Sequence, residues 1–144
     1  MEFVVDTNVL FSFFWKGSPT KELLKKHKLI SPEVALDEIN KYKSVILSKT
    51  GLSSDEFKKL KEELALIVDF IPLEEYSDSL KEAEKLSNSF SENEKQEFLN
   101  DLDFFALSLK SDLPIWSNDK LFKKQPLIDV LTTSEIVSLF GFET

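Results

Sequence analysis

The sequence predicts an α/β fold in which a parallel sheet is covered by helices on both faces. Short apolar runs alternate with segments of helical spacing, and hairpin dipeptides such as Asn-Gly are absent. The 144 residues are 42% hydrophobic and 31% charged, which suits one core beneath a solvated surface. We therefore expect a single domain spanning residues 1–144.

The first third of the chain alternates strand and helix signals. The apolar run Phe3–Val5 predicts a short buried strand. Ser18-Pro19 then opens a helix to about residue 26, with an N-cap followed by proline at the first helical position. Leu29-Ile30 predicts a second strand. Ser31-Pro32 repeats the same cap, and helical spacing continues to about residue 48.

The middle of the chain predicts a third helix and a third strand. Thr50-Gly51 breaks the preceding helix, and Ser53 with Glu56 three residues later forms a capping box. That helix is expected to run to about residue 66. Ile67–Ile71 is a strand candidate closed by Pro72.

The last part of the chain ends the alternation. Residues 77–86 are amphipathic, residues 88–97 form a polar stretch, and Leu102–Leu109 is nearly continuous apolar sequence that predicts a buried helix. Strands are expected at Pro114–Ser117 and Asp129–Leu131, and Thr132 with Glu135 caps the final helix. Ligands bind at the carboxyl ends of parallel strands, which singles out Asp6 and the segment 117–119.

Charge and composition exclude several classes of protein. The 26 acidic residues against 18 basic ones give a formal charge of −8, the wrong sign for a broad phosphate-binding surface. Every basic residue is Lys, so guanidinium clamps on phosphate are absent. If phosphate is the ligand, carboxylates that hold a divalent cation would neutralise it. With 3 Gly there is no glycine-rich phosphate loop, and the lone His27 is read as a surface residue of a Lys-rich helix.

The sequence also carries expectations about compartment. It has no Cys, which excludes disulfides, thiolate metal sites and a cysteine nucleophile and fits a reducing cytosol. The N-terminus lacks the features of a signal peptide, and no apolar run approaches the ~20 residues of a membrane span. We expect a cytoplasmic protein without a membrane partner.

Four acidic residues are candidates for a metal site, each with a structural alternative. Asp6 follows a buried strand and is alternatively a cap for the next turn. Glu38 lies at the edge of an apolar helix face, where an ion pair with Lys is the alternative. Asp101 precedes the buried helix and is alternatively its cap. Asp119 follows the fourth strand and alternatively caps residues 120–123.

Together these acids point to one chemistry. Four carboxylates at the same end of a sheet repel one another unless protons or cations compensate them. Oxygen-only clusters suit Mg²⁺ or Mn²⁺, which activate water for attack on a phosphodiester and stabilise the leaving oxygen. Asn8, two positions after Asp6, could orient Asp6 or the water shell of the metal, and it is equally a turn residue.

The chain resembles the PIN-domain nucleases, which include VapC-type toxins of toxin–antitoxin pairs and RNA-processing proteins. Residues 4–10, Val-Val-Asp-Thr-Asn-Val-Leu, resemble the family's opening strand motif, and residues 101–109 followed by 113–120 resemble its third and fourth motifs. The run Ile-Trp-Ser-Asn-Asp-Lys at 115–120 is the most specific part. The resemblance spans essentially the whole chain.

This resemblance implies a three-layer α/β/α sandwich with a parallel sheet of about four to five strands, a helical clip and frequent homodimers. It implies that four acids bind the divalent metal and orient the attacking water in an endoribonuclease that cuts RNA. These are Asp6, Glu38, Asp101 and Asp119, and the supporting polar groups are Asn8, Ser117 and Asp103. Spacing to Leu113-Pro114 favours Asp101 over Asp103 as the third acid. An antitoxin protein is an implied partner.

Two alternatives remain open at this stage. One is a catalytically silent relative that binds RNA or protein; separate measurements of metal affinity and turnover discriminate it. The other is a phosphatase or phosphotransferase that uses Asp6 as a nucleophile, but such enzymes of the haloacid-dehalogenase kind need a second Asp where this chain has Asn8. The cluster Lys21, Lys25, Lys26 and Lys28 is read as a solvated helix face rather than as an RNA contact.

Overall fold

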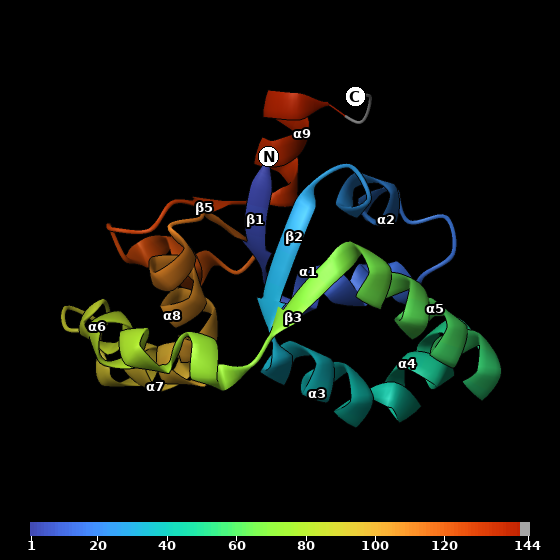
Figure 1. Ribbon diagram of the computed structural model, residues 1–144, viewed down its shortest axis with the longest axis horizontal. Helices are drawn as coiled ribbons and strands as arrows, with labels where there is room; N and C mark the ends of the chain where they lie inside the picture. The colour runs from blue at the N-terminus through green and yellow to red at the C-terminus, as the bar shows by residue number, and fades with distance from the viewer. Residues whose placement is uncertain (142–144) are drawn as a thin grey trace.

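The computed structural model describes residues 1–141, within which a five-stranded parallel sheet forms the centre of the molecule (Figure 1). The strands lie in the order β3-β2-β1-β4-β5, and every neighbouring pair is parallel. Their bounds are Glu2–Val5 (β1), Lys28–Pro32 (β2), Val68–Ile71 (β3), Ile115–Trp116 (β4) and Val130–Leu131 (β5). All five predicted strands are present.

The connections place helices on both faces of the sheet, which confirms the three-layer α/β/α sandwich. The chain steps from β1 to β2 to β3 in one direction and then crosses to β4 and β5 on the other side of β1. Right-handed crossovers therefore put the first helices on one face and the later ones on the other. In Figure 1 the helix α1 lies behind the sheet, and α8 packs against β1, β2 and β4.

The α-helices of the described chain vary from short turns to one of 14 residues. Their bounds are Thr7–Phe11 (α1), Pro19–Leu24 (α2), Glu33–Lys41 (α3), Lys43–Thr50 (α4), Ser54–Ile67 (α5), Leu80–Lys85 (α6), Glu92–Asn100 (α7), Leu102–Ser111 (α8) and Thr133–Phe140 (α9). Short 3₁₀ turns occur at Ser12–Phe14 (η1), Leu73–Glu75 (η2), Ser77–Ser79 (η3) and Lys120–Lys124 (η4).

The core is built on the central strand. Phe3, Val4 and Val5 are fully buried because β1 has a neighbour on each side and helices on both faces. On one face they meet the aromatic start of α8, where Phe104 and Phe105 are also buried. The strand that leads to Asp6 is therefore held rigidly.

Two predicted capping boxes are confirmed. The Ser53 hydroxyl accepts from the Glu56 N–H while the Glu56 carboxylate accepts from the Ser53 N–H, at 3.1 and 2.9 Å. Thr132 and Glu135 make the equivalent pair at the start of α9. These bonds satisfy amide groups that a helix N-terminus otherwise leaves without partners.

The expected cap at Ser31-Pro32 is wrong. Both residues belong to β2, and the buried Ser31 hydroxyl donates instead to the carbonyl of Val5 at 2.8 Å. The helix starts at Glu33 with Pro32 in the N-cap position, and it does not continue to residue 48. The backbone turns at Tyr42, where φ is −93° and ψ is 12°, and this turn divides the segment into α3 and α4.

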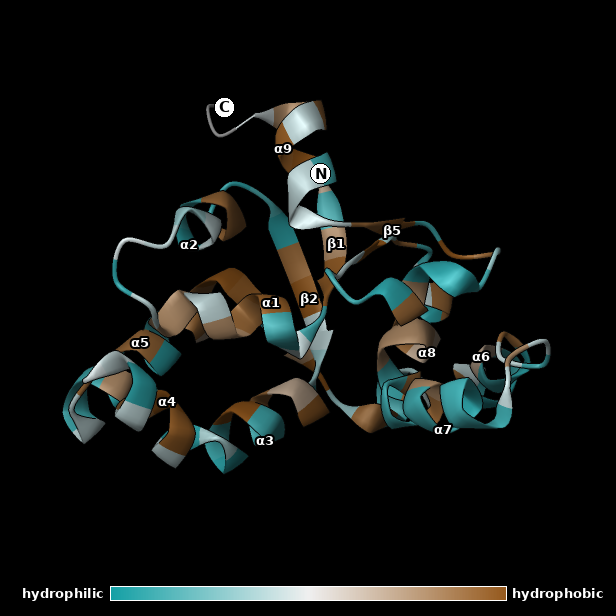
Figure 2. Cartoon of the chain, turned by 180° about the vertical axis from the view of Figure 1, so that it is seen from behind, coloured by the Kyte–Doolittle hydropathy of each residue, from teal (hydrophilic) through white to brown (hydrophobic). Residues whose placement is uncertain are grey.

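Two helices were not predicted. α1 begins at Thr7, directly after β1, with Asp6 in the N-cap position; the sequence offered Asp6 as an alternative cap for a turn but predicted no helix there. α7 occupies part of the polar stretch and begins with a capping box of Ser91 and Glu94. Figure 2 shows why its pattern was missed: the helix is coloured almost entirely as hydrophilic.

No helix within residues 1–141 is long and apolar enough to cross a lipid bilayer.

Candidate active site

Asp6 lies at the carboxyl end of β1 with only 3% of its surface exposed. It occupies the N-cap position of α1, but its side chain makes no capping hydrogen bond, so the structural alternative does not account for it. The Ser117 hydroxyl donates to Asp6 Oδ2 at 2.8 Å. Burial raises the pKa of Asp6 to about 6, and Asp119 adds to the increase, while the bond from Ser117 and the backbone amides of Asn8 and Thr7 oppose it.

Glu38 reaches the same edge from α3 and is half-buried. Within residues 1–141 it forms no ion pair, so the expected Lys partner is absent; instead the Thr7 hydroxyl donates to Glu38 Oε1 at 3.4 Å. Burial raises the pKa of Glu38, and the charge of Asp6 raises it further. The two carboxylates therefore act on each other.

Asp101 stands at the start of α8, in the N-cap position, again without a side-chain cap bond. Burial raises its pKa to about 7, and the charges of Asp6, Asp119, Glu38 and Glu97 contribute in that order. Three predicted site residues thus repel Asp101 although they belong to separate parts of the sequence. Asp6, Glu38 and Asp119 come after the carboxyl ends of β1, β2 and β4, so the predicted acids lie near the same edge of the sheet.

Asp119 takes the capping role that was its structural alternative, and it also lies near other acids of the candidate site. It follows β4, and its Oδ1 atom accepts from the Leu121 N–H at 2.9 Å, so it does cap the 3₁₀ turn η4. Its own N–H donates to the Ser117 hydroxyl at 3.1 Å, and Ser117 in turn donates to Asp6. The cap occupies one carboxylate oxygen and leaves Asp119 close enough to raise the pKa of both Asp6 and Asp101.

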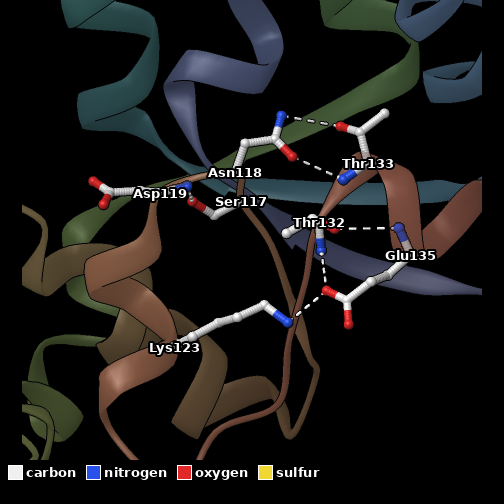
Figure 3. A network of polar contacts seen from close by, with 7 residues as sticks. All are labelled: Ser117, Asn118, Asp119, Lys123, Thr132, Thr133 and Glu135. Atoms are coloured by element: carbon white, nitrogen blue, oxygen red, sulfur yellow. Dashed lines mark hydrogen bonds and ion pairs between the residues drawn. The ribbon is translucent and has the colours of Figure 1, made fainter.

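The loop that carries Asp119 is anchored to the start of α9 (Figure 3). The Asn118 side chain accepts from the Thr133 N–H at 2.8 Å and donates to the Thr133 hydroxyl at 3.1 Å. The Trp116 indole N–H donates to the same hydroxyl at 3.0 Å. In Figure 3 the Asp119 side chain points away from this network.

The supporting residues differ from one another in role. Ser117 is fully buried and bridges Asp6 and Asp119, as expected of a supporting group. Asn8 is exposed and has no side-chain hydrogen bond within the described chain. Asp103 accepts a hydrogen bond from the buried Tyr76 hydroxyl at 2.5 Å, so it fixes α8 against the preceding segment rather than facing the site freely.

Sequence reasoning missed two contributors. Thr7 is 2% exposed, and its hydroxyl donates to Glu38. Its position directly after Asp6 was a usable signal that it belongs to the candidate site. Glu97 lies in the unpredicted helix α7 and raises the pKa of Asp101 by its charge. Its presence at the site could not be read without first recognising that helix.

The reading of His27 as a surface residue is wrong. The ring is half-buried and meets Phe3, Trp116 and Phe140 edge-on, with centroid separations of 5.5, 6.1 and 5.4 Å. Burial lowers the pKa of His27, which favours the neutral ring. His27 directly precedes β2, so it lies at the amino end of the strands, opposite the acidic edge.

The donor set at this edge suits a hard divalent cation. It consists of carboxylate oxygens with hydroxyls behind them, and Mg²⁺ and Mn²⁺ prefer oxygen ligands. Among residues 1–141, no three Asp, Glu, His or Cys side chains already converge as a ligand set does.

We expect Ser117→Ala to lower the free energy of unfolding by about 1–3 kcal/mol. The change removes the hydroxyl between Asp6 and Asp119 and leaves a buried carboxylate oxygen and an amide N–H without their partner. Urea denaturation of both proteins at pH 7.5 measures the effect. Ser138→Ala, at an exposed position of α9, is the matched control and should change stability little; equal stability of wild type and Ser117→Ala would contradict the bridging role.

Comparisons with known proteins identify the family to which this site belongs. A model of the PIN domain matches residues 4–137, and the chain therefore belongs to the PIN-domain family. PIN domains are generally nucleases that use divalent metal ions. Asp6, Asp101 and Asp119 lie in the segments of this chain that resemble the family's motifs.

A solved structure supports the fold. The structure described as VapBC2 from Rickettsia felis bound to a DNA fragment from their promoter is 14% identical, with a TM-score of 0.59. The match covers 92% of this chain and 98% of that chain. At this identity the likeness concerns the fold alone. No curated protein sequence matches the chain.

Proposed function

We propose that this chain is an Mg²⁺- or Mn²⁺-dependent endoribonuclease that hydrolyses RNA phosphodiester bonds. The observation that carries the proposal is a set of carboxylates without the usual compensation: Asp6 and Asp101 occupy N-cap positions without making cap bonds, and Asp6, Glu38 and Asp101 form no ion pair within residues 1–141. Burial raises the pKa of all three, and the charge of Asp6 raises the pKa of both Glu38 and Asp101. A protein retains such costly repulsion where a cation replaces the missing protons. Membership in a family of nucleases supports the same proposal.

The acids and the hydroxyl residues have different parts in the proposed site. Asp6, Glu38, Asp101 and Asp119 would hold the cation, which when bound activates water and stabilises charge on the leaving oxygen. Ser117 keeps one Asp6 oxygen in a fixed direction through its 2.8 Å hydrogen bond. Thr7 restrains Glu38 in the same manner, at 3.4 Å. The buried strand beneath Asp6 limits its movement, so the carboxylate is positioned before substrate arrives.

Two settings are consistent with this activity. The chain is proposed to be either the toxin of a toxin–antitoxin pair, with an antitoxin protein as its partner, or an RNA-processing enzyme. The structure described as VapBC2 supports the first setting through its shared fold. A homodimer is also proposed, from the resemblance of the sequence to the PIN-domain nucleases.

The test is cleavage of end-labelled single-stranded RNA by the full chain with Mg²⁺, with Mn²⁺ and with EDTA. We expect cutting with either metal and none with EDTA, and the products should map to internal bonds. Calorimetric titration with Mn²⁺ should show binding in the same buffer. Metal binding without any cleavage would favour the catalytically silent alternative, and cleavage that persists in EDTA would contradict the proposed chemistry.

A further inference from the structure

A pocket of about 360 Å³ adjoins the acidic edge. Glu38 belongs both to the acidic site and to the wall of this pocket, and Asn8, two residues after Asp6, forms the neighbouring wall. The remaining lining is aromatic and aliphatic, with one cation. It consists of Phe11, Trp15, Tyr42, Val45, Ile46 and Lys49. Most of the lining is therefore apolar, and Glu38 and Asn8 are the polar residues nearest in sequence or space to the acidic site.

Two aromatic rings in this pocket are exposed. Tyr42 is 44% exposed and Trp15 is 37% exposed, whereas the other Trp, Trp116, is fully buried. Phe11 meets Tyr42 edge-on with a centroid separation of 6.0 Å and supports its ring from the side. Tyr42 also ends α3 at the turn into α4, so its backbone is fixed by both helices. An exposed, supported ring is a surface on which a planar group can stack.

A second pocket, of about 290 Å³, shares the lining residue Trp15 with the first. Trp15 lines both, and the second pocket brings together three Lys side chains: Lys16, Lys21 and Lys59. Its single acid, Glu56, is held in the capping box of α5, where its carboxylate accepts from the Ser53 N–H. On a chain with a formal charge of −8, this is a local gathering of positive charge.

The two pockets lie on one side of the molecule. The helices α1, α3, α4 and α5 that carry them are grouped together in Figure 2, and α1 contacts α3 while η1 contacts α1, α2 and α5. The surface thus runs from Glu38 past Tyr42 and Trp15 to Lys16 and Lys59. We call it the aromatic–lysine track.

Its order of groups matches an unpaired nucleic-acid strand. Bases of a single strand are free to stack on aromatic rings, while the phosphates beside them seek cations; in a duplex the bases are already stacked and paired. The track offers exposed rings and one cation, Lys49, in the pocket that includes Glu38, and three further cations in the pocket beyond Trp15. An apolar peptide would gain little from the Lys end, and a duplex would gain little from the rings.

We propose that single-stranded RNA beside the cleaved bond lies along the aromatic–lysine track, with bases stacked on Tyr42 and Trp15 and phosphates beside Lys16, Lys21 and Lys59. This inference rests on the proposed function, whose substrate class it narrows to unpaired strands. It also explains how an acidic chain without Arg holds RNA, because attraction is confined to one surface.

Trp15 supplies the readout for a test of binding. Hexauridylate is titrated into the full chain in EDTA, so that binding is observed without metal-dependent cutting, and tryptophan emission is recorded. We expect saturable quenching, because Trp15 is the exposed one of the chain's 2 Trp residues. Trp15→Phe should lose the quenching while retaining most of the binding measured by anisotropy of fluorescein-labelled hexauridylate. A self-complementary RNA duplex of equal length should bind more weakly.

Two variants separate stacking from charge. Tyr42→Ala should weaken hexauridylate binding by roughly 5- to 100-fold, the range for loss of one base–aromatic stack. The double variant Lys16→Gln, Lys59→Gln should reduce the dependence of log affinity on log salt by about 0.7 for each lost phosphate contact. Lys81→Gln with Lys85→Gln, at exposed positions of α6, is the matched control and should leave both quantities unchanged. Circular dichroism confirms that each variant is folded.

Three results would overturn the inference. Unchanged affinity in Tyr42→Ala would remove the stacking step, and saturable anisotropy without Trp15 quenching would place RNA elsewhere. Emission that changes with protein concentration but not with hexauridylate would show that the track is an interface between copies of the chain. Failure of the track is distinguishable from failure of the nuclease proposal. If only the track is wrong, the wild type still cuts RNA with metal, and Tyr42→Ala cuts it with unchanged KM. If only the nuclease proposal is wrong, hexauridylate quenches Trp15 emission but metal produces no cleavage.

Discussion

Asp6→Asn is expected to reduce metal-dependent RNA cleavage by about three orders of magnitude at pH 7.5. The amide has nearly the size of the carboxylate and can still accept the hydrogen bond from Ser117, so the local structure should persist. What it loses is the negative charge of the most buried of the four acids. Removal of one group that positions charge for the transition state commonly costs a factor of 10²–10³ in rate, and weaker metal binding adds to this.

The control for this prediction is Asp129→Asn. Asp129 is exposed and precedes β5, so it lies at the amino end of the strands, opposite the acidic edge. The same chemical change there should leave cleavage within about twofold of the wild type. Rates are measured at several Mn²⁺ concentrations; full recovery of the variant at high Mn²⁺ would assign Asp6 to metal affinity alone, and wild-type rates at all concentrations would remove it from the site.

The positions of the strands were predictable because each is a short apolar run whose burial on both faces leaves a continuous signal. The candidate site could be predicted from the strand positions, since Asp6 directly follows β1 and Asp119 comes shortly after β4, and these two strands lie side by side. Asp101 was predictable from its place before the apolar helix α8. Its proximity to Asp6 depends on the long crossover from β3 to β4, which spacing alone does not determine.

The parts that could not be predicted are those set by tertiary contacts. Ser31 carries the sequence signature of a helix cap, yet its hydroxyl is taken by the Val5 carbonyl of the neighbouring strand. Tyr42 interrupts a segment whose apolar spacing is helical throughout, and its ring then packs on Phe11. Glu97 lies on a helix with little apolar periodicity, so its charge at the site was hidden in a polar stretch.

Asp101→Asn is expected to stabilise the metal-free protein at pH 8. The pKa of Asp101 is about 7 in the folded chain, above the ordinary value of 3.8, because burial and the neighbouring acids disfavour its charge. Between those two values the folded state binds more protons than the unfolded state, so this group makes stability fall as pH rises from about 4 to about 7. Above pH 7 the wild type carries the full penalty of the charged form, and Asn carries none.

Solvent reaches Asp101, so screening reduces the penalty, and we expect a gain of about 1 kcal/mol and a rise in Tm of several degrees. Thermal unfolding in EDTA at pH 8 and at pH 4.5 measures it; the gain should be present at pH 8 and nearly absent at pH 4.5, with Asp129→Asn unaffected at both. A lower Tm for Asp101→Asn at pH 8 would mean that the carboxylate makes contacts that outweigh the repulsion. Addition of Mn²⁺ should then raise the Tm of the wild type more than that of the variant, because a cation removes the same repulsion that the substitution removes.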